Sequence, residues 1–125
     1  MRLLLDSHIL IWLMAEDARL TAEARTLISG ATEVFASTAS IWELAIKVSL
    51  GKLHLDIERL VSLLDAAGIY ELQITRPHAM AVARLPLLHR DPFDRLLIAQ
   101  AIAEPMRLLT ADAHLAAYSE LVVTI

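Results

Sequence analysis

The sequence predicts an α/β fold with three layers, in which helices cover both faces of a central, mainly parallel sheet of four to five strands. Short apolar runs alternate along the chain with longer segments of helical periodicity. Such alternation is typical of parallel strands joined by right-handed crossover helices. The first run, residues 2–5, is apolar after its first residue and ends at an acid, as expected of a central strand covered on both faces.

Four helices and two strands are predicted in the first half of the chain. Residues 8–14 are apolar nearly all round and form a short buried helix that ends near Glu16 and Asp17. The second strand is expected at residues 33–36. The other three helices each follow a residue that can cap an N-terminus and end at a glycine: residues 21–29 between Thr21 and Gly30, residues 38–50 between Ser37 or Thr38 and Gly51, and residues 56–67 between Asp56 and Gly68.

The second half continues the alternation. Residues 69–74 form the third strand, and a helix begins at Arg76-Pro77, where proline is tolerated in the first turn, and runs to about Leu85 before Pro86 stops it. After a loop over residues 87–90, the next helix begins at Asp91-Pro92-Phe93-Asp94, which fit the positions N-cap to N3, and ends near Glu104-Pro105. The remaining elements are a strand over residues 107–109, a short helix over 113–118 and a β-branched strand over 121–125.

Length and composition restrict the class of protein. A chain of 125 residues with no repeat, linker or low-complexity segment is expected to form one domain, residues 1–125. Hydrophobic residues make up 57% of it, which is too apolar for disorder and leaves some apolar surface for a partner. No apolar stretch approaches the roughly 20 residues of a membrane span, and an acid follows too early for a signal peptide. We therefore expect a cytoplasmic protein that contacts no membrane.

Charge and cysteine content restrict the chemistry. The absence of cysteine excludes disulfides, thiolate catalysis and cysteine-based zinc sites, so oxygen and imidazole are the expected metal ligands. The net charge is −4, so binding to nucleic acid through overall positive charge is not expected and any such contact would be local.

Acidic residues occur where packing residues are expected. Asp6 follows the first strand and Asp112 closely follows the strand over residues 107–109, so both belong to the carboxyl edge of the sheet, where ligand sites form. Asp94 stands in the first turn of a helix, and Glu43 lies in the middle of an apolar helix. Because buried carboxylates are costly without a cation, several converging ones indicate a site for a hard divalent ion such as Mg²⁺ or Mn²⁺.

Each acid also has a structural explanation. Asp91 is most simply a helix cap, Asp94 could complete a capping box, and Asp112 could cap the helix that follows it. Glu43 could form a solvated ion pair with Lys47 one turn later. Asp6 has the weakest structural explanation of the acids. The joint placement of the acids, more than any single position, therefore supports a metal site.

Four segments of the chain carry these acids in a fixed order: Leu3–Ser7 (LLLDS), Ser40–Lys47 (SIWELAIK), Arg90–Ala101 (RDPFDRLLIAQA) and Leu109–Asp112 (LTAD). Over the whole chain they resemble PIN domains and, more closely, the toxin ribonucleases of VapBC-type bacterial toxin–antitoxin pairs. The resemblance implies a metal-dependent endoribonuclease that uses Mg²⁺ or Mn²⁺ and leaves a 5′-phosphate and a 3′-hydroxyl. It also implies a homodimer neutralised by a VapB-like, DNA-binding antitoxin.

The same resemblance assigns roles to individual residues. Asp6, Glu43, Asp94 and Asp112 match the acidic quartet of the family, which holds the metal and carries catalysis. Asp91 belongs to a subgroup pattern and is a secondary contributor, while Ser7 and Thr110 match small hydroxyl positions that orient a carboxylate or water. Basic side chains near the acids are hypothetical RNA contacts: Lys47, His89, Arg90 and Arg95, the last of which could instead pair with an acid.

Other polar and aromatic residues give no second site. The five histidines, His8, His54, His78, His89 and His114, lack paired metal spacing, and most are expected at the surface or in helix packing. Trp12 and Trp42 lie on apolar helix faces and are expected in the core or an interface, not in base stacking.

Two other functions remain open at this stage. One is a phosphoryl-transfer domain of the receiver or dehalogenase type, although Asp6 has no second acid two residues later and no lysine follows in a comparable strand-end position. The other is a non-catalytic module whose acids bind a structural cation or a partner. The sequence does not specify which RNA is cleaved or how many metal ions bind.

Overall fold

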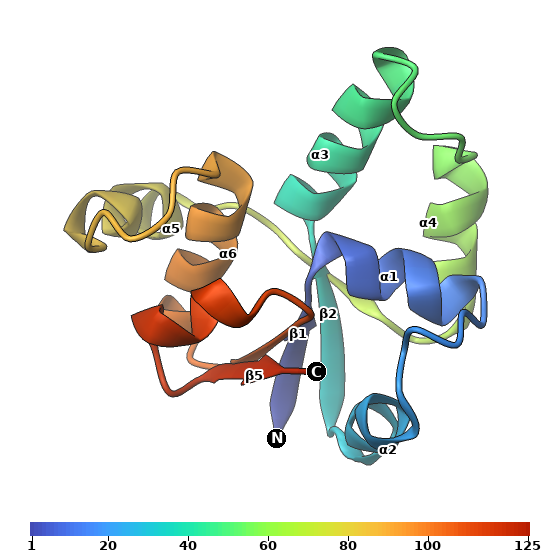
Figure 1. Cartoon of the computed structure of the whole chain (residues 1–125), viewed down its shortest axis with the longest axis horizontal. Coiled ribbons are helices and arrows are strands. Elements are labelled where there is room, and N and C mark those ends of the chain that lie inside the picture. The colour runs from blue at the N-terminus through green and yellow to red at the C-terminus, as the bar shows by residue number, and fades with distance from the viewer.

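The computed structural model describes residues 1–125 and contains one five-stranded sheet (Figure 1). Every pair of neighbouring strands is parallel, in the order β3-β2-β1-β4-β5. The predicted α/β fold is therefore confirmed, with five strands and no antiparallel pair. The strands are β1 Arg2–Leu5, β2 Glu33–Ser37, β3 Tyr70–Leu72, β4 Arg107–Thr110 and β5 Val122–Thr124.

The predicted helices are present, with small differences at their ends. Gly30 lies inside the last turn of its helix instead of following it, whereas Gly51 and Gly68 follow theirs with φ of 71° and 76°, the left-handed conformation that favours glycine. The helix expected to run to Leu85 becomes 3₁₀ in its last turn. The helices are α1 Ser7–Met14, α2 Ala22–Gly30, α3 Thr38–Ser49, α4 Ile57–Ala66, α5 Arg76–Ala81 and α6 Pro92–Ala103, with 3₁₀ helices η1 Val82–Arg84 and η2 Ala113–Tyr118.

Side chains of the central strand alternate between two hydrophobic layers. Leu3 and Leu5 pack in a cluster with residues of α1, α3 and α4, whereas Leu4 packs on the opposite face with residues of α6. All three leucines are fully buried. This alternation is the period of two that a strand covered on both faces requires, and Figure 1 shows the helices on either side of the sheet.

The strand order reverses at the centre of the sheet, beside β1. The chain adds β2 and β3 on one side of β1 and β4 and β5 on the other, so the strand order reverses between β1 and β4. Their carboxyl ends are adjacent, since the backbone N–H of Asp6 donates to the carbonyl of Leu109 at 3.0 Å. Ligand sites of open α/β sheets form beside such a reversal. None of the helices has the length and apolar character required to cross a bilayer.

Candidate functional site

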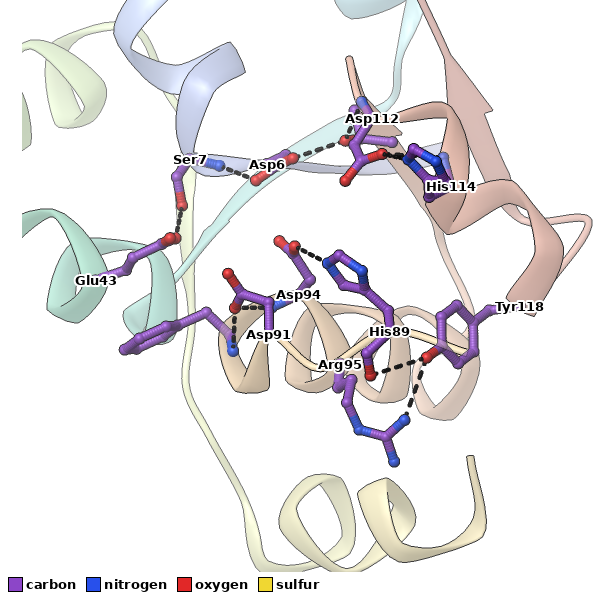
Figure 2. A network of polar contacts seen from close by, with 12 residues as sticks. Asp6, Ser7, Glu43, His89, Asp91, Asp94, Arg95, Asp112, His114 and Tyr118 are labelled. Atoms are coloured by element: carbon purple, nitrogen blue, oxygen red, sulfur yellow. Dashed lines mark hydrogen bonds and ion pairs between the residues drawn. The ribbon is translucent and has the colours of Figure 1, made fainter. Parts of the chain in front are cut away.

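Five acidic side chains line one cavity of about 430 Å³ at the carboxyl edge of the sheet. They come from four parts of the chain and include all four residues of the predicted quartet together with Asp91. Figure 2 shows these side chains around a common space. The lining residues are Asp6, His8, Trp12, Glu43, Lys47, Asp91, Asp94, Ala111 and Asp112.

A threonine hydroxyl joins the acids that follow β1 and β4. Thr110 Oγ1 donates to Asp6 Oδ2 at 2.7 Å and accepts from the backbone N–H of Asp112 at 3.1 Å. Asp6 also caps α1, because its Oδ1 accepts from the N–H of Ser7 at 2.6 Å. Thr110 is fully buried, so this link is fixed by the sheet and holds both acids at neighbouring positions.

The mid-helix acid of α3 turns toward the same cavity. Ser7 Oγ donates to Glu43 Oε1 at 2.6 Å, and Lys47 Nζ lies 3.2 Å from Glu43 Oε2. The predicted pairing of Glu43 with Lys47 is therefore present. The side chain of Glu43 is only 9% exposed, however, so this is not the solvated surface pair of the structural explanation.

The N-terminus of α6 supplies two further acids with different contacts. Asp91 is the N-cap, and its Oδ1 accepts from the N–H groups of Phe93 and Asp94 at 2.8 and 3.2 Å, as its structural explanation predicts. Asp94 Oδ2 instead lies 2.9 Å from Nε2 of His89. Asp91 thus both caps the helix and lines the cavity, while the side chain of Asp94 is directed toward its neighbours in the site.

Burial, hydrogen bonds and neighbouring charges shift the pKa values of three of these carboxylates. Burial raises the pKa of Asp94 to about 6, and the negative charges of Asp6, Asp91 and Glu43 add to this shift against a hydrogen bond with His89. Burial also raises the pKa of Asp6, although hydrogen bonds from Thr110 and Ser7 oppose it. For Asp112, burial is outweighed by hydrogen bonds from His114, which hold its pKa below the usual range.

The donor set fits a hard divalent cation. Among the residues that line the cavity, five are acids and only Lys47 is a permanent cation. Carboxylate oxygens are the ligands preferred by Mg²⁺ and Mn²⁺. One oxygen each of Asp94 and Asp112 and one ring nitrogen of His89 also lie within 4.8 Å of one another. The chemistry of these side chains thus suits a metal centre better than an anion site.

Some expected contacts are not observed. Arg95 is buried, its guanidinium does not line the cavity, and the alternative ion pair with an acid is not observed. The phosphate contact stays a prediction. It donates to the carbonyls of Val82 and Pro86 at 3.1 and 2.9 Å and to Tyr118 Oη at 3.2 Å. The carbonyl of Leu85, at 3.5 Å, is a third backbone contact, so both terminal nitrogens of the guanidinium have two partners. Arg95 therefore holds the loop before α6.

The tryptophans differ in their burial. Trp12 is partly buried and packs against the core, as expected, while also lining the cavity. Trp42 is 57% exposed, so its expected place in the core is wrong, and an interface stays a prediction. Its ring packs edge-on against Phe93 at 5.1 Å between centroids.

The histidines follow the expectation with one exception. His8, His54 and His114 are exposed, and His78 is buried in helix packing against Glu104 of the neighbouring helix end. His89 is the exception because it is partly buried in a loop, with its ring against Asp94. Sequence reasoning placed His89 near the acids as an RNA contact but missed its contact with Asp94, the contact of His114 with Asp112 and the position of His8 in the cavity lining. The position of His8 two residues after Asp6 was a usable signal, whereas the approach of His89 depends on the loop conformation.

Comparisons with known proteins agree with this geometry. The family model described as "PIN domain" matches residues 3–121. The chain belongs to the PIN domain family. A relative from Mycobacterium tuberculosis, "Ribonuclease VapC22", is 36% identical over 114 residues, which are 90% of this chain and 88% of the relative.

Solved structures share the fold of this PIN domain. A crystal structure of VapBC2 from Rickettsia felis, bound to a DNA fragment of its promoter, superposes with a TM-score of 0.74 at 18% identity, covering 99% of this chain and 98% of that one. FitAcB from Neisseria gonorrhoeae gives a TM-score of 0.67 at 18% identity over 98% and 96% of the two chains. The predicted PIN-like three-layer fold is therefore confirmed.

Neutralising Asp94 is expected to stabilise the metal-free PIN domain. The folded-state pKa of about 6 lies above the ordinary value of 3.8 for an aspartate, so the stability that protonated Asp94 contributes below pH 4 is lost as pH rises through 6. Asp94→Asn should therefore raise the free energy of unfolding at pH 7.5 by about 1 to 3 kcal/mol, and most of the gain should disappear toward pH 4. Urea denaturation in chelator measures this, with the exposed Asp65→Asn as control. A destabilised Asp94→Asn at pH 7.5 would contradict the cost assigned to burying the Asp94 charge beside other acids.

Replacing Arg95 and measuring stability and RNA binding distinguishes a structural role of this residue from a contact with RNA. Arg95→Lys keeps the charge but cannot donate to several carbonyls at once, so it should lower the free energy of unfolding by about 2 kcal/mol. Urea denaturation tests this against Arg90→Lys, a matched change of an exposed arginine. Unchanged stability together with weakened RNA binding would instead support the phosphate clamp.

Proposed function

We propose that this PIN domain is the toxin of a type II toxin–antitoxin module, a metal-dependent endoribonuclease that hydrolyses RNA phosphodiester bonds in the cytoplasm. The observation that carries the proposal is the convergence of Asp6, Glu43, Asp91, Asp94 and Asp112 on one cavity. The raised pKa values of Asp6 and Asp94 support it, because they record a cost of negative charge that a cation would offset. The relative named a ribonuclease adds support from sequence.

In this proposal Asp6, Glu43, Asp94 and Asp112 hold Mg²⁺ or Mn²⁺, with Asp91 as a secondary contributor. The chemistry supplied by a bound divalent cation is charge stabilisation at the reacting phosphate and a lowered pKa for the attacking water. Thr110 and Ser7 fix the carboxylates of Asp6 and Glu43 through the hydrogen bonds described above, so these acids need little rearrangement when the substrate arrives. No covalent intermediate on the protein is required.

RNA contacts are proposed only near the cavity, because the net charge of −4 gives no general attraction. Lys47 lines the cavity and presents its ammonium group beside Glu43. Arg90 is exposed in the loop just before Asp91 and is free to approach the phosphate backbone. His89 is better suited to the acids than to RNA, since its ring is already directed at Asp94.

We also propose a homodimer and a VapB-like antitoxin as partners. The supporting observations are exposed apolar side chains, with Trp42 at 57%, Met80 at 64% and Leu87 at 90% exposure, and apolar grooves between α5 and α6 and between α1 and α4. A similar fold comes from a structure named as a toxin–antitoxin complex from Klebsiella pneumoniae. Light scattering of the chain alone should give twice the monomer mass, and a monomer at every concentration would contradict the dimer.

Removing one carboxylate tests the proposed nuclease. Asp6→Asn and Asp94→Asn should each lower cleavage of total RNA at least about 100-fold while the protein stays folded, because each loses a charged ligand. Cleavage is followed with Mg²⁺, Mn²⁺ or chelator, and mapping of the new 5′ ends identifies the target. Asp65→Asn, an exposed acid remote from the cavity, should cleave like the unchanged protein. Undiminished cleavage by Asp6→Asn would contradict the catalytic assignment.

A further inference from the structure

An imidazole lies beside the acids without being part of the predicted quartet. Nε2 of His89 is 2.9 Å from Asp94 Oδ2, and the His89 side chain is 27% exposed. One ring nitrogen of His89 forms a compact group with one carboxylate oxygen of Asp94 and one of Asp112, all within 4.8 Å of one another. A cation with ligand bonds of about 2.1 to 2.3 Å could contact all three after small side-chain movements. Figure 2 shows the ring directed into this space.

The loop that carries His89 is held by a buried network. Arg95 donates to carbonyls of the segment 82–86 and to Tyr118 Oη, and the Tyr118 hydroxyl donates to the carbonyl of His89 at 3.5 Å (Figure 2). Both the start of the loop and His89 itself are thereby tied to α6 and η2. The backbone that carries the imidazole is thus held by side chains that do not themselves reach the acids.

We propose that His89 is a nitrogen ligand of the divalent cation, and that it makes the centre prefer Mn²⁺ over Mg²⁺. This inference rests on the proposed metal-dependent function and adds the identity of the cation to it. Mg²⁺ binds almost entirely through oxygen. Mn²⁺ has the lowest affinity for nitrogen among the first-row divalent ions, but unlike Mg²⁺ it belongs to that series and accepts an imidazole beside carboxylates. A centre of carboxylates alone would have no such reason to discriminate.

The chain contains two matched controls for this role. His8 is exposed and lines the cavity, and His114 lies 3.0 Å from Asp112 Oδ1 with its side chain 87% exposed. Each is an imidazole near an acid, but neither belongs to the compact group of potential ligand atoms. His8→Gln and His114→Gln therefore remove an imidazole and its charge from the same neighbourhood without removing the proposed nitrogen ligand.

The experiment measures Mn²⁺ and Mg²⁺ affinity by titration calorimetry and records pulsed electron paramagnetic resonance of bound Mn²⁺. His89→Gln should weaken Mn²⁺ binding about 10-fold or more and Mg²⁺ binding far less, and the coupling of Mn²⁺ to a histidine nitrogen should disappear. Both controls should keep the nitrogen coupling, because each leaves His89 in place, and His8→Gln should also keep the Mn²⁺ affinity. Tyr118→Phe, which loosens the loop but leaves the ligand, should keep the coupling and lower the Mn²⁺ affinity less than His89→Gln does.

The outcomes separate this inference from the function on which it rests. If the unchanged protein binds Mn²⁺ and His89→Gln binds it equally, with the nitrogen coupling intact, His89 is not a ligand and the proposed nuclease still stands. If the coupling is lost in His8→Gln or His114→Gln instead, the assignment to His89 is also overturned. If the unchanged protein binds neither ion and Asp94→Asn behaves in the same way, the proposed metal centre itself fails. Circular dichroism of each variant in chelator verifies folding.

Discussion

Mutual repulsion among carboxylates at the carboxyl edge of the sheet is the constraint around which the site is built. Five acids line one small cavity, and the protein offsets their charges only in part. Thr110 and Ser7 donate hydroxyl hydrogen bonds, Lys47 pairs with Glu43, and His89 lies against Asp94. Together with burial, the repulsion that these partners leave uncompensated raises the pKa of Asp94. Without a cation, this arrangement lowers the free energy of unfolding. Groups held at such a cost, with shifted pKa values, occur mostly at functional sites.

Much of the fold and of the site could be predicted from the sequence, because the strands, the helix starts and the acids beside them follow local sequence patterns. An apolar run that ends at an acid predicted β1 and the position of Asp6, and a cap pattern predicted the start of α6 with both of its acids. Parallel strands bring their carboxyl ends to one edge, so the convergence of Asp6 and Asp112 follows from topology alone. Glu43 needed one further inference, that a charge in an apolar helix must face something polar.

The residues that could not be predicted depend on contacts between distant segments. Arg95 follows an acid in sequence, and nothing local indicates that its guanidinium turns toward three carbonyls and Tyr118. The exposure of Trp42 was missed because α3 contains apolar residues around much of its circumference, so periodicity does not decide which of them faces solvent. The approach of His89 to Asp94 depends on a loop with no regular hydrogen-bonding pattern.

The cavity also explains how a protein with a net charge of −4 could act on a polyanion. Without a cation, the five acids would repel a phosphate from the very place where the proposed chemistry occurs, and one lysine among the lining residues is too little to reverse that field. Each divalent cation bound there removes two negative charges from the local balance. Attraction of RNA and assembly of the reactive centre would then be one event, because the cation that completes the site also permits the substrate to approach it.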